Sequence, residues 1–380
     1  MNSQPDFARF RRALLCQGEG DRVPLAELGI EMYVKQAFLG RPIRGLADEV
    51  DFWARAGYDF VPLDHGLHSL LERSSTLRGS GSLLLNPHHK IVDVLRKSGR
   101  AIQETYELYE DSAHERVWQP EGRGLITNQE EFESFPWVTA DDFDYSKFAE
   151  VASALPQRMK IVAVLGYIYT AVWQLMGFET FCGSLAEDPD LVAKLFDKTG
   201  SIQYEVLERI TRSDAVGAVC HPDDIAYCEG PMISPKYLRH YLFPWVKRCA
   251  ALCKERGLPF IYHSDGNLCQ VLDDLVNCGV NALHPVEPKA MDIVGLKQRY
   301  GGKLCLIGNI DLSYTLTLGT PREVEEEVKE RLRQVAGGGG YCLGSSNSIP
   351  GYVPLANYLA MREAGLRYGW YPITIPGGPS

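Results

Sequence analysis

The fold is decided by residues 259–266, which read PFIYHSDG. The first four are an unbroken apolar run, typical of a strand that is covered on both faces, as in a parallel sheet. His263 and Asp265 follow at once, and Gly266 permits an immediate turn. Polar side chains directly after a buried strand predict that chemistry lies at the carboxyl end of that strand.

Seven further apolar runs recur along the chain with helical patterns between them, which favours a (β/α)8 TIM barrel within the α/β class over an open doubly wound sheet. The eight predicted strands are residues 23–30, 58–63, 161–165, 215–220, 259–262, 280–283, 304–307 and 340–343. No glycine-rich nucleotide-binding motif supports the open alternative.

Helix signals place three of the predicted helices closely. Ser234 followed by Pro235 predicts a helix start, Gly257 its end, and Pro244 a kink inside it. Residues 320–323 form a capping box that predicts a helix to about 336, and a last helix is predicted over 354–369.

The whole chain, residues 1–380, is predicted to be a single barrel domain, since no linker divides it. The stretch 70–154 is long, charged and aromatic. We interpret it as an insertion between the second and third strands that lies near the barrel mouth. The tail after residue 372 is rich in proline and glycine and is predicted to fray.

Composition excludes several classes of protein. Apolar residues make up 45% of the chain and charged residues 23%, which is typical of a globular protein and not of a disordered one. A net charge of -10 argues against a nucleic-acid surface. No apolar run approaches the roughly 18 residues needed to span a membrane, and the first residues do not read as a signal peptide.

The ten cysteines form no CxxC pair. We interpret them as reduced thiols of a cytoplasmic protein. Cys249 and Cys253 lie four apart on a predicted helix and could share a metal, although neighbouring core positions explain them equally well.

Polar residues follow nearly every predicted strand and would converge at one end of the barrel. In strand order they are Glu27 and Glu31; Asp64 and His65; Tyr167, Tyr169 and Trp173; His221, Asp223 and Asp224; His263, Ser264 and Asp265; His284 and Glu287; Asn309 and Asp311; Ser345, Ser346 and Asn347. Loops are polar in any protein, so this convergence alone favours an enzyme only modestly.

The sharpest signal among them is His263 with Asp265. Side chains two apart on an extended segment point the same way, so the pair could hold a divalent metal or act as an acid/base couple. The alternative is a histidine and an aspartate bonded to nearby backbone. The adjacent carboxylates of Asp223 and Asp224 repel, which raises one pKa or requires a cation, unless they cap a helix.

Several landmarks in the second half resemble the uroporphyrinogen decarboxylase superfamily, which also contains corrinoid-dependent methyltransferases. They are residues 230–235 (GPMISP), 263–266 (HSDG), 284–288 (HPVEP), 308–311 (GNID), 319–324 (GTPREV), 338–341 (GGGY), and Pro354 with Asn357 and Met361. The resemblance implies a (β/α)8 barrel with its pocket at the carboxyl ends of the strands.

Within that superfamily the chain looks closer to methyltransferase-like members than to true decarboxylases. True decarboxylases grip substrate carboxylates through arginines near the first strand, whereas residues 23–30 carry none. Arg22 precedes that strand, and Arg41 and Arg44 lie in a later loop. Asp64 matches the decarboxylase carboxylate that serves the pyrrole nitrogens.

Zinc methyltransferases of the superfamily bind their metal through His-x-Cys and a later cysteine. Here His263 matches the histidine, Asp265 stands at the first cysteine, and Ser346 or Asn347 falls near the second. The resemblance therefore implies a divalent metal, zinc being one candidate, with His263, Asp265 and Glu287 as ligands. The set is harder than a thiolate site and suits oxygen ligands.

The leading hypothesis is a methyltransferase component that moves a methyl group from a small methylated substrate, such as an aromatic methyl ether, to a corrinoid. His263, Asp265, Asp224 and Asp64 are the predicted catalytic residues. The predicted substrate-binding residues are Tyr167, Tyr169, Trp173, Asn309, Ser346 and Asn347. The chain has no Asp-x-His-x-x-Gly motif, so the corrinoid would arrive on a partner protein.

Two alternatives stay open at this point. One is a decarboxylase-like lyase that acts on a porphyrinogen or a smaller carboxylic acid and needs neither metal nor partner. The other is a binding barrel that has lost catalysis. We expect a small-molecule ligand in each case, no nucleic acid and no membrane, while a homo-oligomer is left open.

Overall fold

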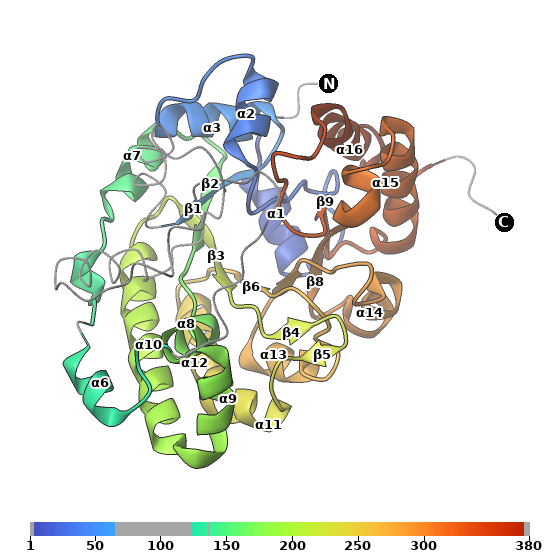
Figure 1. The fold of residues 1–380 in the computed structure, drawn as a ribbon. Coiled ribbons are helices and arrows are strands. Elements are labelled where there is room, and N and C mark those ends of the chain that lie inside the picture. Colours follow the sequence, from blue (N-terminus) through green and yellow to red (C-terminus); the bar gives the residue numbers. More distant parts are fainter. Residues whose placement is uncertain (1–3, 65–123, 136, 376–380) are drawn as a thin grey trace.

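The computed structural model of the chain describes residues 4–64, 124–135 and 137–375 (Figure 1). Most of the predicted insertion, residues 70–154, therefore lies outside the described residues, as does the end of the tail. The part of it that is described, from 124 on, is mainly short helices that lead into the second strand of the sheet.

Seven parallel strands form one curled sheet in the order β1-β2-β3-β6-β7-β8-β9. The strands are β1 (Phe60–Asp64), β2 (Lys160–Val164), β3 (Val216–Pro222), β6 (Phe260–His263), β7 (Ala282–His284), β8 (Cys305–Ile310) and β9 (Tyr341–Ser345). A two-residue antiparallel hairpin, β4 (Ala226–Tyr227) with β5 (Gly230–Pro231), follows β3. Seven of the eight predicted strands are confirmed, and the α/β fold resembles a TIM barrel.

The first predicted strand, residues 23–30, is wrong as a regular strand. Its strand-like pairing is limited to isolated parallel bridges, from Leu25 to Leu343 of β9 and from Ile30 to Ile349 beyond that strand. Pro24 has no amide hydrogen, so a ladder through it cannot be continuous. The segment lies beside β9, where an eighth strand would stand, and the bonds that attach it there run from Ala26 N to Leu343 O and from Leu343 N to Pro24 O.

Fourteen α-helices, one 3₁₀ turn and two π-helical turns complete the described chain, and Figure 1 shows helices around the outside of the sheet. They are α1 (Phe7–Leu14), α2 (Met32–Leu39), α3 (Leu46–Arg55), α6 (Gln129–Ser134), η2 (Ala140–Asp142), α7 (Ser146–Ala154), α8 (Tyr169–Met176), α9 (Phe178–Glu187), α10 (Pro189–Ile210), α11 (Pro235–Tyr237), η3 (Leu238–Leu242), α12 (Phe243–Glu255), α13 (Leu272–Cys278), α14 (Ile293–Tyr300), η4 (Leu312–Leu316), α15 (Pro321–Val335) and α16 (Leu355–Tyr368). The predicted capping box at Thr320 is confirmed. Pro244 is the second residue of α12, and the π-helical turn η3 directly precedes that helix.

Alternation along the strands separates two buried layers. Phe60, Val162, Ile261, Ala282 and Cys342 belong to a cluster inside the curled sheet, while residues of opposite parity pack against the outer helices. Helix α1 adds four side chains to the inner cluster, and the ring of Phe10 stacks on that of Phe60 with centroids 4.4 Å apart. Because Phe60 is the first residue of β1, α1 closes the amino end of the sheet and leaves the carboxyl end for the site.

A buried charge network fastens α1 to the start of β1. Arg9 Nη1 lies 2.6 Å from Asp59 Oδ1, and Arg22 Nη2 lies 3.6 Å from the same oxygen. Arg9 also forms a bidentate pair with Asp21. The side chains of Asp59 and Arg22 have no exposed surface, so each charge depends on the other.

We predict that Asp59→Ala lowers the free energy of unfolding by about 3–5 kcal/mol, because it leaves two guanidinium groups without their buried partner. The matched control is Asp141→Ala, which removes a pair with Arg209 in which the aspartate is 84% exposed. This control is expected to cost less than about 1 kcal/mol. Urea denaturation measures both, and equal losses would contradict the assignment.

A buried carboxyl group attaches the irregular first segment to β9. Glu27 has no exposed surface, and its two oxygens accept bonds from Ser345 N at 2.6 Å and Ser345 Oγ at 2.8 Å. Burial raises the pKa of Glu27 from 4.5 to about 8, and the two bonds from Ser345 oppose that shift. Between about pH 4.5 and pH 8 the folded chain therefore keeps a proton on Glu27 that the unfolded chain releases.

Since the folded pKa lies above the unfolded one, this contribution to stability is complete below about pH 4.5 and is lost as pH rises toward 8. Glu27→Gln keeps a neutral side chain of the same shape and removes the titration. Between pH 5 and 8.5 the wild-type protein should lose on the order of a few kcal/mol more stability than this variant. Denaturation curves at both pH values test this, and parallel losses would refute it.

Candidate functional site

Two histidines end neighbouring strands on the inner face of the sheet. His263 is the last residue of β6 and His284 the last of β7, and the strand register pairs them directly. Their neighbours two residues earlier, Ile261 and Ala282, lie in the inner cluster. Side chains two apart share a face, so both imidazoles point to the inside at the carboxyl end.

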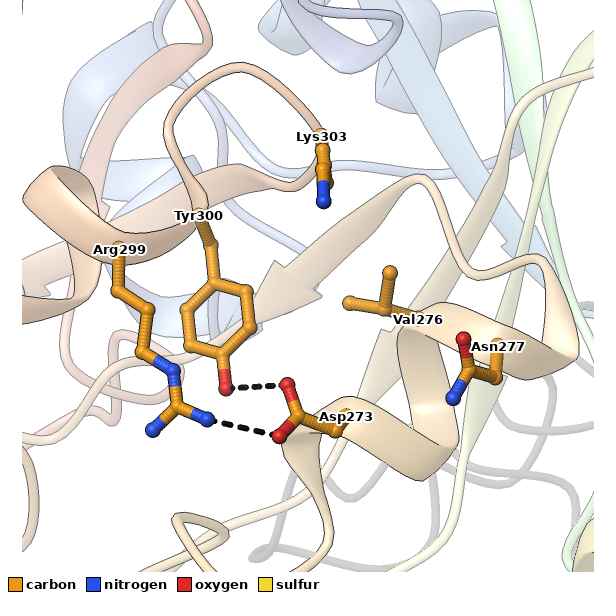
Figure 2. A pocket seen from close by; sticks show the side chains of 6 residues that line it. All are labelled: Asp273, Val276, Asn277, Arg299, Tyr300 and Lys303. Atoms are coloured by element: carbon orange, nitrogen blue, oxygen red, sulfur yellow. Dashed lines mark hydrogen bonds and ion pairs between the residues drawn. The ribbon is translucent and has the colours of Figure 1, made fainter.

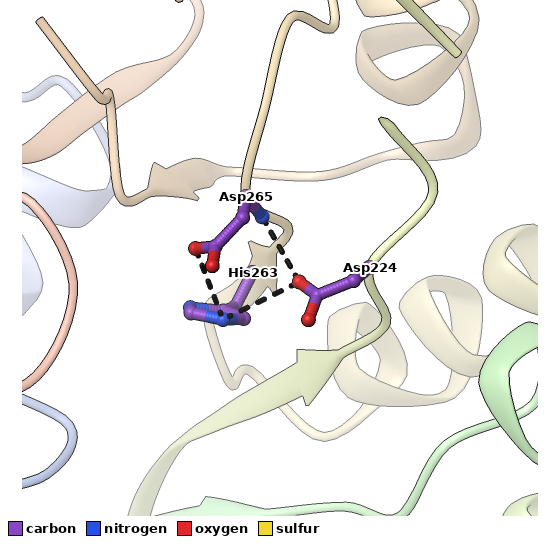
Figure 3. Close-up of side chains that lie close together, drawn as sticks. All are labelled: Asp224, His263 and Asp265. Carbon is purple, nitrogen blue, oxygen red and sulfur yellow. Dashed lines mark hydrogen bonds and ion pairs between the residues drawn. The ribbon is translucent and has the colours of Figure 1, made fainter. Parts of the chain in front are cut away.

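Asp224 and Asp265 bring carboxylates to His263, as Figure 3 shows. His263 Nε2 lies 3.7 Å from Asp224 Oδ1 and 3.9 Å from Asp265 Oδ1. One ligand atom from each of the three side chains lies within 4.8 Å of the others, a spacing that could hold a metal ion. We call these three residues the triad.

Exposure decreases from the loops toward the strand. The Asp224 side chain is 45% exposed, that of Asp265 29%, and that of His263 13%. The triad is thus reachable from solvent on the side of its carboxylates, while its imidazole is covered. Within the part of the chain that the structure describes, it is the one cluster of three or more histidine, cysteine, aspartate or glutamate side chains that could hold a metal ion.

The loop after β6 is held in place by bonds that orient the triad. Asp265 N donates to Asp224 Oδ1 at 2.9 Å, and Asn347 Nδ2 donates to Asp265 Oδ2 at 2.7 Å. Gly266 N donates to Glu287 Oε2 at 2.7 Å. Gly266 adopts a φ of +83°, and a Cβ there would collide with the carbonyl of Ala226, so glycine is required at this turn.

The two histidines contact each other through their Nδ1 atoms, which are 2.7 Å apart. Burial lowers the pKa of His263, and the charges of Asp224 and Glu287 oppose that shift. Burial, with a smaller effect of His263, holds the pKa of His284 well below its usual range. Burial thus favours the neutral form of both rings, which is the form in which an imidazole binds a metal.

Adjacent aspartates after β3 have different surroundings. The fully buried carboxylate of Asp223 accepts bonds from the backbone N–H groups of Ile168, Tyr169 and Thr170, at the start of α8. It therefore satisfies orphan donors of a helix terminus, which is the capping alternative for this pair. Asp224 alone turns toward His263.

The remaining predicted catalytic residue, Asp64, ends β1. It is buried, and its register partner Val164 belongs to the inner cluster, so its carboxylate also lies on the inner face. Glu287, the third predicted metal ligand, lies beside the triad and bonds the backbone of Gly266.

Predicted substrate-binding residues fall into two groups. Asn309 lies on the inner face, where its Nδ2 donates to the carbonyl of Val286, and Asn347 supports Asp265. Ser346 Oγ accepts a bond from Leu312 N. Of the aromatic set, Tyr169 is fully buried against Phe181 and Phe196, Trp173 packs edge-on against Phe178, and Tyr167 is half-buried just before α8.

The sequence places His284 after the sixth predicted strand but does not predict its contact with His263. A signal for that contact is present, because each histidine directly follows a predicted strand and the two strands are consecutive in sequence. Adjacent strands of equal parity place such end residues side by side. The contact between Asn347 and Asp265 had no comparable signal, since it joins loops 82 residues apart.

A cleft of about 420 Å³ lies elsewhere, between α13 and α14 (Figure 2). Its lining is polar, and its aspartate, Asp273, is already engaged by Arg299 at 2.7 Å and by the Tyr300 hydroxyl at 2.8 Å. None of the triad residues borders it. The triad is therefore the candidate site on grounds of chemistry.

Among the described helices, none is long and apolar enough to cross a membrane.

Comparisons with known proteins agree with this architecture. The family model described as uroporphyrinogen decarboxylase (URO-D) matches residues 142–368, more than half of the chain. Among solved structures, a methyltransferase from Methanosarcina mazei superposes with a TM-score of 0.69 at 18% identity, covering 95% of this chain and 98% of that one. A sugar phosphate isomerase/epimerase from Parabacteroides distasonis gives a TM-score of 0.38 at 10% identity, over 94% and 100% of the two chains. No curated protein sequence matches the chain.

The different roles of the two adjacent aspartates can be separated by stability. We predict that Asp223→Ala lowers the free energy of unfolding by at least about 2 kcal/mol, because three buried N–H groups lose their acceptor. Asp224→Ala, at a half-exposed side chain, should cost about 1 kcal/mol or less. Chemical denaturation of both variants tests this, and a greater loss for Asp224→Ala would reverse the assignment.

Proposed function

The chain belongs to the uroporphyrinogen decarboxylase family. Because the superfamily of that name also contains corrinoid-dependent methyltransferases, we propose that the chain is a methyltransferase component. It takes a methyl group from a small methylated substrate, such as an aromatic methyl ether, and passes it to a corrinoid that a partner protein carries. The fold it shares with the Methanosarcina mazei methyltransferase is compatible with that class of reaction.

The triad is the observation that carries the proposal. Ligand atoms of a tetrahedral zinc ion, each about 2.1 Å from it, lie about 3.4 Å apart. The distances of 3.7 and 3.9 Å from His263 Nε2 to the two carboxylate oxygens are a little longer than this spacing, so a small movement of the two aspartates would bring them to it. One imidazole nitrogen with two carboxylate oxygens suits a borderline or hard divalent cation, zinc among them.

The chemistry needs a group that stabilises negative charge on oxygen. The reduced cobalt of the corrinoid would supply the electron pair of the new carbon–cobalt bond, while the bond from the methyl carbon to the ether oxygen breaks and leaves its electron pair on that oxygen. A divalent cation on the triad would act as a Lewis acid for that oxygen. Asp224 and Asp265 supply the charge that retains such a cation, and Asn347 and the backbone of Asp265 fix the direction of the two carboxylates.

The other predicted residues complete the proposal. Asn309 and Asp64, both on the inner face, would contact the substrate inside the sheet. Tyr167, just before α8, and Trp173, within α8, would lie near the mouth. Glu287 adds negative charge near His263 and would be a further ligand of the cation. The resemblance is the source of two further parts of the proposal, the corrinoid protein as partner and zinc as a candidate metal. The cysteine content is the source of a third, the cytoplasmic location.

A porphyrinogen decarboxylase is the weaker candidate, because two of the three early arginines are engaged elsewhere. Arg22 is buried beside Asp59 at the amino end of the sheet, opposite the site. Arg41 pairs with Asp48 and Asp51 on the surface. Neither is free to grip the carboxylates of a tetrapyrrole.

The test combines elemental analysis with methyl transfer. Wild-type protein should hold one divalent ion per chain and, with a reduced corrinoid protein and a panel of methyl ethers, should produce the absorbance of a methylated corrinoid. His263→Ala should lose the ion and slow transfer by at least about 100-fold, the equivalent of about 3 kcal/mol of lost stabilisation. His240→Ala, on the outer turn η3, is the matched control and should behave as wild type.

Metal-loaded wild-type protein that methylates no corrinoid with any donor would contradict the proposal. Product formed from a carboxylic acid in the presence of chelator would favour the decarboxylase instead.

A further inference from the structure

The contact between His263 and His284 restricts where their protons lie. A neutral imidazole has one N–H donor and one lone-pair acceptor. Two Nδ1 atoms 2.7 Å apart therefore share a single proton, and one ring must donate to the other. Only two arrangements of neutral rings satisfy this condition.

In the first arrangement His263 carries its proton on Nδ1 and donates it to His284. The lone pair of His263 Nε2 then faces Asp224 and Asp265, and the proton of His284 lies on Nε2. In the second arrangement His284 donates from Nδ1, and His263 carries its proton on Nε2, pointing toward the carboxylates.

The two arrangements suit different states of the triad. Without a cation, a lone pair facing two carboxylates is repulsive, whereas an N–H is attracted to them, so the second arrangement is favoured. A cation needs the lone pair of His263 Nε2 as a ligand, so it requires the first. Because the rings share one proton, His263 cannot change its tautomer unless His284 changes too.

We propose that His284 is the positioning residue of the triad: it accepts the Nδ1–H of His263, directs the Nε2 lone pair at the cation, and turns its own Nε2–H toward the interior of the sheet. This role rests on the proposed cation site. It gives His284 the part that a carboxylate or carbonyl usually plays behind a metal-ligating histidine, without adding charge.

The Nε2 atom of His284, on the far side of its ring from His263, has the features of a substrate contact. His284 is 1% exposed, and its Nε2 has no hydrogen-bond partner within the described residues. Asn309 Oδ1, at the end of the next strand, is buried and equally unpartnered there. A buried donor and a buried acceptor left open on one face call for a ligand with an oxygen acceptor and a neutral donor, such as a hydroxyl group beside the methylated oxygen.

Variants at His284 test whether its acceptor for the Nδ1–H of His263 supports binding of the cation. His284→Phe keeps an aromatic ring but removes the acceptor, and should weaken Zn²⁺ binding by about 10–100-fold. His284→Gln retains an acceptor oxygen and should keep most of the affinity. The matched control is His240→Phe, which makes the same substitution at an exposed histidine of η3, and it should bind Zn²⁺ as wild type does. Competition with a chromophoric chelator measures all four proteins.

Ring-nitrogen NMR of the wild-type protein tests the coupled change of tautomer in His263 and His284 without any substitution. With ¹⁵N-labelled histidine, addition of Zn²⁺ should move the proton of His284 from Nδ1 to Nε2 while the ring stays neutral. A purely structural histidine would keep one tautomer throughout.

The outcomes separate the two proposals. If the wild-type protein binds Zn²⁺, His284→Phe binds it equally tightly and His284 keeps its tautomer, the role of His284 is refuted and the cation site stands. If the wild-type protein binds no Zn²⁺, the cation site is refuted and the role of His284 with it.

Discussion

The parallel pairing of β6 with β7 is the constraint on which the site depends. It places His263 opposite His284 on one face, with their Nδ1 atoms in contact. Because the inner face at the amino end is filled by α1 and apolar side chains, only the carboxyl end can admit polar groups. The loops that follow β3 and β6 then carry Asp224 and Asp265 to the open side of the same imidazole.

Buried polar groups elsewhere make that geometry rigid. Asp59 pairs with Arg9 of α1 and so holds this helix at the amino end of the sheet, and Glu27 attaches the irregular first segment to β9. Asp223 fixes α8 against the end of β3, one residue before Asp224. Glu27 and Asp223 are among the polar residues that the sequence places at the strand ends, yet they, like Asp59, satisfy donors that would otherwise be unpaired.

Much of the fold could be predicted, since parallel strands buried on both faces leave a continuous apolar run. The first segment misled because its composition is that of a strand, while Pro24 prevents a continuous ladder. His263 and Asp265 were identified from their spacing of two. Asp224 could be separated from Asp223 only in three dimensions, because the choice depends on which carboxylate meets the start of α8.

The most direct test of the account is a crystal grown with Co²⁺ or Zn²⁺ and measured at the absorption edge of the metal. We predict one anomalous peak between His263 Nε2, Asp224 Oδ1 and Asp265 Oδ1. Fully occupied metal at another position, or no peak at the triad at saturating concentration, would contradict the central claim.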